Sequence, residues 1–251
     1  MRLFPDALDL YGDSGNTQVL ERRLAWRGIP ARVSDVLLDS DLDSLDVQAP
    51  CIVLIGGGSD RGQIASTHAL HRLEGKLRSL IDRGGVVFAV CGGFQLLGRS
   101  CVVAGERVEG LGIIPMDTVA SPDGSRIIGH TAEVLGSDGT GLKVAGFENH
   151  AGRTWLDEGA RPLGLTRQGR GNNGEDGTEG YWGGHVVGTY LHGPILAKNP
   201  ALVDALLAMA LGDDWDGVGE PDLAVLGGPL DDLLEDVAHI HAVNLATQAA
   251  K

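Results

Sequence analysis

The segment that most constrains this chain is an apolar run, Val86–Val90, that leads directly into Cys91-Gly92-Gly93. Five apolar residues in succession predict a fully buried strand, and the apolar stretch after the glycines predicts the start of a helix. A cysteine on a sharp strand-to-helix turn is typical of a nucleophile, because small neighbours allow the strained turn and let substrate approach backbone N–H groups. The helix N-terminus also favours thiolate over thiol. Taken alone, the motif fits a buried structural cysteine equally well.

A second apolar strand, predicted over residues 185–191, ends at His192. A thiolate nucleophile needs a proton carrier, which is usually histidine. In open parallel sheets, ligands bind outside the carboxyl ends of the strands, so Cys91 and His192 would share one rim if their strands are neighbours. A lone histidine after a strand is more often structural, but its pairing with Cys91 favours a catalytic role.

A third strand, predicted over residues 51–55, runs into Gly56-Gly57-Gly58. Glycines at this place leave backbone N–H groups accessible, which suits an oxyanion hole beside the nucleophile. The alternative is a flexible strand-to-helix turn, and the motif alone does not decide between them. A dinucleotide fingerprint is excluded, because Arg61 occupies the place of the third glycine.

These three elements, in this order, resemble the class I glutamine amidotransferases. The runs at residues 91–98 (CGGFQLLG) and 188–193 (GTYLHG) are similar to the cobyric acid synthase-like branch of that class. Within the branch, residues 10–16 (LYGDSGN), 146–154 (GFENHAGRT) and 192–200 (HGPILAKNP) resemble the GatD family, the glutaminase subunits of lipid II isoglutaminyl synthase. The resemblance runs from residue 8 to residue 210, and the remaining residues are not diagnostic.

The resemblance implies that Cys91 attacks the side-chain amide of glutamine and that His192 carries the proton. The oxyanion would be held by backbone N–H groups of Gly57 and Gly92. Most class I enzymes carry a glutamate two positions after the histidine, whereas this chain has Pro194, as is usual in the branch. We therefore expect either that a partner subunit supplies the acid that orients the histidine, or that the enzyme works as a Cys-His dyad.

Two further residues are predicted to bind substrate. In the family, the arginine of the segment that contains Arg126 holds the α-carboxylate of glutamine, and guanidinium groups suit this role because they bind carboxylates through two hydrogen bonds. Without the resemblance, Arg126 fits an ordinary surface arginine. Gln95 lies four residues after the nucleophile, one helical turn away, where it could hydrogen-bond the substrate.

The resemblance also implies a partner, because a lone glutaminase would waste glutamine. The expected partner is a MurT-like, Mur ligase-like synthetase subunit that would carry ATP and magnesium and form a heterodimer with this chain, which itself needs no cofactor. The acceptor would be the D-glutamate of lipid II in peptidoglycan synthesis, in the cytoplasm or at the inner face of the cell membrane. Two alternatives are a glutaminase subunit of a cobyrinic acid-type amidotransferase and an inactive binding module on the same fold.

Alternating strand and helix patterns predict an α/β fold, with a mainly parallel, flavodoxin-like sheet covered by helices on both faces. We expect helices over residues 17–26, with Asn16 as cap, over a segment that includes Leu70, Leu73, Leu77 and Leu80, and over residues 200–211; a further strand is expected over residues 33–38. Residues 105–190 predict antiparallel strands and loops near the active rim. The amidotransferase domain would span residues 1–211, and residues 212–251 would form an extension packed on it or flanking it, ending in a helix.

Composition excludes several classes of function. With 251 residues, 43% hydrophobic content and a net charge of −14, the chain fits a globular enzyme domain and argues against a nucleic-acid partner. The N-terminus does not read as a signal peptide, and three cysteines cannot all pair, which indicates a reducing cytoplasm; Cys51 and Cys101 are expected in the core. Residues 136–143 approach a phosphate-binding loop but lack its lysine spacing, so we expect no ATP site here. The pairs His68/His71 and His239/His241 have no third ligand at useful spacing, so we expect no metal site.

Overall fold

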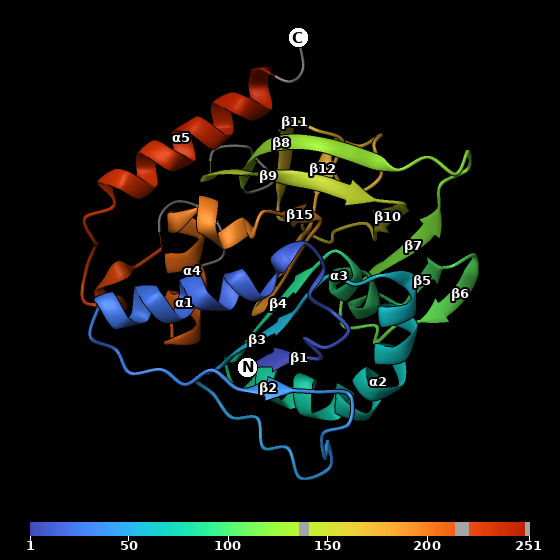
Figure 1. The fold of residues 1–251 in the computed structure, drawn as a ribbon, viewed down its shortest axis with the longest axis horizontal. Coiled ribbons are helices and arrows are strands. Elements are labelled where there is room, and N and C mark those ends of the chain that lie inside the picture. Colours follow the sequence, from blue (N-terminus) through green and yellow to red (C-terminus); the bar gives the residue numbers. More distant parts are fainter. Residues whose placement is uncertain (136–140, 214–220, 249–251) are drawn as a thin grey trace.

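The computed structural model describes residues 1–135, 141–213 and 221–248. Its centre is a six-stranded sheet in the order β13-β14-β4-β3-β1-β2 (Figure 1). All neighbouring pairs in this sheet are parallel except β13 with β14. Its strands are β1 (Arg2–Leu3), β2 (Asp35–Val36), β3 (Ile52–Ile55), β4 (Val86–Val90), β13 (Tyr181–Gly183) and β14 (Val186–Thr189).

Helices cover both faces of this sheet, which confirms the predicted α/β class (Figure 1). One face carries α1 (Ser14–Trp26) and α4 (Pro200–Ala210), and the other carries α2 (Asp60–Asp82) and α3 (Gly92–Leu97). The predicted leucine row of α2 is buried against the sheet, because residues three and four apart lie on one side of a helix. β4 is buried along its whole length, as its continuous apolar run predicts.

Two further sheets cover one edge of this core. The first has the order β10-β7-β5-β6 and the second has the order β12-β11-β8-β9-β15. Most of their strand pairs are antiparallel, as predicted for residues 105–190. Their strands are β5 (Ser100–Val103), β6 (Glu106–Glu109), β7 (Met116–Ala120), β8 (Ile127–Leu135), β9 (Lys143–His150), β10 (Gly152–Leu156), β11 (Gly164–Gln168), β12 (Thr178–Glu179) and β15 (Leu191–His192).

The strand that leads to His192 follows the prediction only in part. β14 lies beside β4 in parallel, and the Cys91 N–H donates to the carbonyl of Thr189 (2.8 Å), so the two strands are neighbours as expected. The central strand ends at Thr189, however, and His192 lies in β15, which pairs antiparallel with β9. Tyr190 is the residue between β14 and β15. Its N–H donates to Glu179 (2.5 Å), and its ring stacks on that of His150.

Two local predictions also need correction. The first helix begins at Ser14 rather than at residue 17, and Asn16 is not its cap but lies inside it. The Asn16 side chain instead accepts the N–H of Leu196, in the 3-10 turn η2 (Ile195–Lys198). The strand predicted over residues 33–38 shortens to β2, because only Asp35 and Val36 pair with β1.

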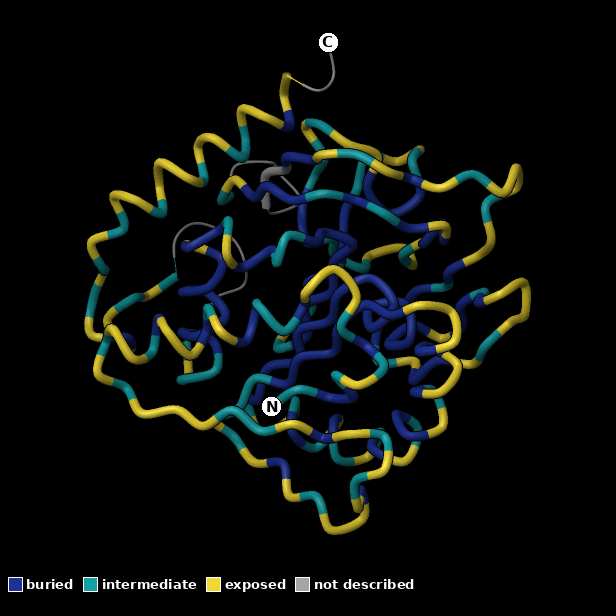
Figure 2. The backbone as a smooth tube through the Cα atoms, in the orientation of Figure 1, coloured by how far each residue is buried: buried dark blue, intermediate teal, exposed yellow. Residues whose placement is uncertain are grey.

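The segment after residue 212 contributes η3 (Leu223–Leu226), which was not predicted, and ends, as the sequence predicts, in a helix, α5 (Leu233–Gln248). α5 is exposed along much of its length (Figure 2). Before it, Asp232 reaches the buried guanidinium of Arg23 on α1 (2.8 Å), which also pairs with Asp204 on α4 (2.6 Å). Most of the loop that approaches a phosphate-binding motif lies outside the described residues. Within them, no helix is both long and apolar enough to cross a membrane.

Candidate active site

Cys91 occupies a strained turn between β4 and α3. Its backbone has φ 50° and ψ −104°, a conformation that non-glycine residues rarely adopt and that persists where the surrounding structure enforces it. A side chain at Gly93 would place its Cβ 2.5 Å from the carbonyl oxygen of Ile55, so the turn requires glycine there. Cys91 is 8% exposed, at the carboxyl edge of the central sheet. These features are those of a nucleophile elbow.

His192 is fully buried in an aromatic enclosure. The ring of Tyr11 meets it edge-on (centroids 4.7 Å apart), and the ring of Phe147 stacks on it (5.4 Å). Burial disfavours the charged imidazolium, but Asp13 and Cys91 outweigh burial and raise the pKa of His192 to about 9. A histidine of this kind holds its proton readily beside a thiolate.

Gly57 marks the point where the central side chains meet. A Cβ at this glycine would lie 3.1 Å from Cε1 of His192, 3.2 Å from Cβ of Cys91 and 3.3 Å from Oδ2 of Asp13. The structure therefore brings together the two predicted catalytic residues and a carboxylate that the sequence reasoning did not select. The glycine turn after β3 also lies in this cluster, as expected.

The hydrogen bonds of the turn change one prediction. The Gly57 N–H donates to Oδ2 of Asp13 (2.6 Å), so it is already engaged and is not a free donor for an oxyanion. Gly58 is better placed, because its nitrogen would lie 3.1 Å from a Cβ at Gly92, the residue after the nucleophile. Gln63 of α2 packs over this spot and donates to the carbonyl of Gly58 (3.1 Å).

Asp13 is the carboxylate of this cluster that the sequence reasoning did not select. It is 1% exposed, and its Oδ1 lies 3.5 Å from Nδ1 of His192. A buried carboxylate beside a buried imidazole is costly unless the two interact. The sequence carried one signal for it: an aspartate set between two glycines, Gly12 and Gly15, in the block at residues 10–16 that marks the family.

Arg126 lies on the surface near this centre, linked to it through two side chains. Its guanidinium donates to the side chain and carbonyl of Asn149 (2.9–3.0 Å), and the Asn149 amide donates to the hydroxyl of Tyr11 (2.6 Å). Tyr11, which covers His192, has φ 62° within η1 (Leu10–Gly12). Asn149 and Tyr11 thus connect Arg126, the predicted carboxylate clamp, to His192, the predicted proton carrier.

The amide nitrogen of Gln95 is already engaged inside the protein. Its Nε2 donates to the buried hydroxyl of Tyr190 (3.0 Å), which also shares a hydrogen bond with Thr154 (2.6 Å). A Cβ at Gly152 would lie 2.5 Å from that same nitrogen, so the amide is packed against β10. The predicted role of Gln95 in substrate binding could use only its oxygen.

The Phe-Glu-Asn-His segment of β9 divides its side chains between two faces, as alternation along a strand requires. Phe147 and Asn149 face the active centre, whereas Glu148 accepts the N–H groups of Arg170 and Gly171 and holds that loop. His150 stacks on Tyr190 (3.7 Å), and burial lowers its pKa to about 3, so it stays neutral.

The other cysteines differ from Cys91. Cys101 is fully buried in β5, and burial raises the pKa of its thiol to about 11, while Cys51 is half-buried before β3. Neither lies at a strand-to-helix turn. Across the described ranges, no group of three histidine, cysteine or acidic side chains is arranged to hold a metal ion.

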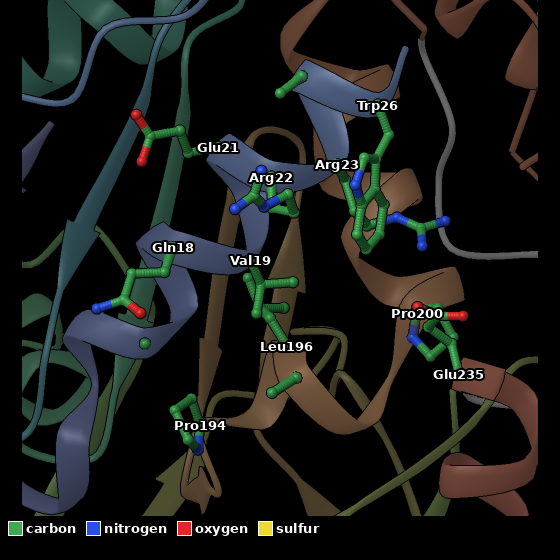
Figure 3. Close-up of a pocket in the computed structure, with 13 residues that line it drawn as sticks. Gln18, Val19, Glu21, Arg22, Arg23, Trp26, Pro194, Leu196, Pro200 and Glu235 are labelled. Carbon is green, nitrogen blue, oxygen red and sulfur yellow. The ribbon is translucent and has the colours of Figure 1, made fainter.

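A large open groove of about 810 Å³ lies beside the catalytic centre and does not include it. Figure 3 shows its walls: Val19 and Trp26 come from α1, Pro194 and Leu196 from the segment after His192, and Glu235 from α5. The groove is therefore lined in part by the segment that follows His192. The catalytic centre itself is nearly closed, as the exposures of Cys91 and His192 show.

Comparison with known proteins connects this geometry to a family. Residues 2–200 match the model of the CobB/CobQ-like glutamine amidotransferase domain. The chain is 39% identical over 206 residues to the GatD subunit of the glutamine-hydrolysing lipid II isoglutaminyl synthase of Staphylococcus aureus, covering 82% of this chain and 81% of the relative. It is 37% identical to the GatD subunit of Streptococcus pneumoniae, covering 83% and 78%. A cobyric acid synthase of Rhodobacter capsulatus is 36% identical over 160 residues, covering 59% and 30%.

Solved structures support the fold. The PurLQS structure from Thermotoga maritima contains a chain with a TM-score of 0.54 at 18% identity, covering 80% of this chain and 91% of that one. A crystal structure of a glutamine amidotransferase has a TM-score of 0.53 at 19% identity, covering 83% and 97%. At these identities the likeness concerns the arrangement of helices and strands alone.

Proposed function

This chain belongs to the CobB/CobQ-like glutamine amidotransferase family, and from that membership we propose that it is the glutaminase subunit of a lipid II isoglutaminyl synthase. It would hydrolyse L-glutamine to glutamate and ammonia through a thioester on Cys91. The observation that carries the proposal is the convergence of Cys91 and His192 on Gly57 at a strained elbow. The likeness to GatD subunits over four fifths of both chains supports the choice of acceptor.

The reaction would proceed in two halves. The thiolate of Cys91 attacks the side-chain carbonyl carbon of glutamine, and the N–H groups of Gly92 and Gly58 stabilise the oxyanion. His192 then gives its proton to the leaving nitrogen, so that ammonia departs and a glutamyl thioester remains. In the second half, His192 takes a proton from water, the hydroxide attacks the thioester carbon, and glutamate leaves as the thiolate is restored.

Arg126 would bind the α-carboxylate of the incoming glutamine. Its guanidinium is exposed and already oriented by Asn149, so a carboxylate could join it without the cost of ordering a free arginine side chain. The link through Asn149 to Tyr11 would place the bound substrate next to the residue that covers His192. Gln95 contributes at most its carbonyl oxygen.

The ammonia would pass to a MurT-like synthetase subunit, which would use ATP and magnesium to amidate the D-glutamate of lipid II. The reaction would take place in the cytoplasm, at the membrane face where the lipid-linked acceptor is found. A cobyrinic acid-type amidotransferase is the second candidate, favoured by the match to cobyric acid synthase. That match covers 59% of this chain, against 82% for a GatD subunit.

The test is a glutaminase assay on the full chain, alone and with the synthetase subunit. We expect glutamate release that Cys91→Ala abolishes, with unchanged thermal unfolding, because alanine fits the elbow and lacks the sulfur. A glutamine-like electrophile should label Cys91 and spare Cys51 and Cys101, as mass spectrometry of the labelled chain can show. Residual hydrolysis within about tenfold of wild type would refute the assignment, since loss of a covalent nucleophile costs far more. Amidation of lipid II but not of a cobyrinic acid acceptor would separate the two candidates.

A further inference from the structure

We propose that Asp13 of this chain is the positioning acid of the active site, orienting His192 in place of the glutamate that Pro194 replaces. This inference rests on the proposed glutaminase function, because its assay measures glutamine hydrolysis. The geometry of Asp13 and His192 does not depend on which acceptor receives the ammonia. It differs from both expectations from the sequence, an acid supplied by a partner subunit and a Cys-His dyad without an acid.

The carboxylate of Asp13 is anchored through one oxygen and open at the other. Oδ2 accepts the Gly57 N–H at 2.6 Å, while Oδ1 is buried, has no hydrogen-bond partner among the described residues and lies 3.5 Å from Nδ1 of His192. Catalytic hydrogen bonds are often this long before substrate binds and then tighten. With Nδ1 directed at Asp13, Nε2 of His192 is the nitrogen left to exchange a proton with Cys91.

The opening block of the chain holds Asp13 in place on both sides. Before it, the Leu10 N–H donates to the carbonyl of Gly57 (2.9 Å). After it, Asn16 accepts the N–H of Leu196 (2.9 Å) on the segment that follows His192. The block therefore binds the glycine turn and the histidine segment together, with the carboxylate between them.

Pro194 fits the same arrangement. A Cβ at Gly15 would lie 2.3 Å from Cγ of Pro194, so α1 packs its first turn directly on the position where relatives in the class carry the acid. A glutamate in place of the proline would meet the backbone of α1 rather than empty space. The acid thus reaches His192 from the N-terminal end of the chain instead of from two residues downstream.

Among the described residues, Asp13 is the one carboxylate recorded beside His192. The other neighbours are Cys91 at the turn between β4 and α3, Tyr11 of η1 and Phe147 of β9. The Lys198 amine lies 5.8 Å from the Phe147 ring centroid, and His150 of β9 stays neutral. An acid from a partner would have to displace one of these groups from a fully buried ring. The raised pKa of His192, to about 9, agrees with a carboxylate already in place.

The decisive variant is Asp13→Asn, because the amide oxygen can still accept the Gly57 N–H while the negative charge is lost. We expect kcat for glutamine hydrolysis to fall at least about 100-fold with KM within about threefold, by analogy with the roughly 10⁴-fold loss when the acid of a Ser-His-Asp triad becomes an amide. Without the carboxylate, the imidazolium is less stable and supports the Cys91 thiolate less. The midpoint of the pH profile for alkylation of Cys91 by iodoacetamide should therefore rise by about one unit.

Asp9→Asn is the matched control, since it removes one negative charge from the same loop at a residue that binds Ser14 instead of His192. It should leave both the hydrolysis rate and the alkylation profile near wild type. All variants are measured as the full chain, alone and with the synthetase subunit. If Asp13→Asn fails to fold, Asp13→Glu keeps the charge and displaces it by one methylene, and it should retain more activity than Asp13→Ala.

The outcomes separate this inference from the proposed function. If wild-type protein hydrolyses no glutamine but the alkylation midpoint still rises in Asp13→Asn, the glutaminase proposal fails and the role of Asp13 stands. If wild type is active and a folded Asp13→Asn keeps its kcat and its alkylation profile, the role of Asp13 is overturned. A wild-type chain that gains a working histidine only when the partner binds would also overturn it.

Discussion

A single methyl group at Gly57 should test the whole catalytic cluster at once. Gly57→Ala places a Cβ 3.1 Å from His192, 3.2 Å from Cys91 and 3.3 Å from Asp13, all closer than ordinary carbon contacts of about 3.5–4.0 Å. The backbone cannot move away easily, because the Gly57 N–H and carbonyl are both hydrogen-bonded, to Asp13 and to Leu10. The neighbouring side chains must therefore shift by a few tenths of an ångström.

The size of the effect follows from these clearances. Inserting a methyl group into a packed interior costs about 1–3 kcal/mol of folding free energy. A misplacement of about 1 Å costs on the order of 10²-fold in rate, so shifts of a few tenths at three side chains together should reduce kcat at least about tenfold. The loss in activity should therefore exceed what the loss in stability explains, since most molecules stay folded.

The assay is steady-state glutamine hydrolysis together with urea unfolding. Gly75→Ala supplies the control: Gly75 lies exposed inside α2 with nothing within 4 Å of a new Cβ, so alanine should stabilise the helix by about 0.5–1 kcal/mol and leave the rate unchanged. If Gly57→Ala folds and keeps kcat within threefold of wild type, as the Gly75→Ala control should, the convergence of catalytic groups on Gly57 is refuted.

Two other predictions concern substrate binding and stability. Arg126→Ala should raise KM for glutamine about tenfold or more with little change in kcat, because the clamp contacts a carboxylate that does not react; an equal effect of Asn149→Ala would show instead that the arginine only holds its neighbour. Asp232→Asn should lower the free energy of unfolding by about 1–3 kcal/mol, since buried Arg23 loses one of two carboxylates while Asp204 remains. The pKa of Asp232 is lowered by its hydrogen bond to Arg23, so this stabilisation is fully present above the ordinary aspartate pKa of about 3.9 and is lost as the pH falls below it. Urea unfolding should therefore show a difference between the two proteins that stays constant from about pH 7 to about pH 5 and narrows below about pH 4; a difference that stays constant at acid pH would contradict the ion pair.

The sequence predicted those parts of the fold that depend on local patterns. The run Val86–Val90 favoured a buried strand because it is short, rich in valine and bounded by glycines, and the leucine spacing of α2 favoured a helix packed on one side. The cysteine at the elbow could be predicted from the sequence in the same way, because its strained turn needs glycine next to it. These elements form the layer that positions the nucleophile.

What the sequence did not predict depends on contacts between distant residues. Asp13 lies 179 residues before His192 in the chain, and its role emerges only when the opening block packs against the histidine segment. The shift of His192 into a second sheet depends on Glu179, which captures the N–H of Tyr190. The amide of Gln95 turned inward for a similar reason, because the hydroxyl of Tyr190 was buried beside it.

Tyr11 bears on access to the active site through both its ring and its backbone. His192 is fully buried and Cys91 is 8% exposed, and the ring of Tyr11 is one of the groups that separate the imidazole from solvent. The left-handed backbone of Tyr11 holds about 1–3 kcal/mol of strain. A rearrangement of η1 that releases this strain would therefore cost less than the loss of the Tyr11 ring contacts alone suggests. Tyr11 is thus both a residue that covers the buried imidazole and one whose strained backbone favours its own displacement.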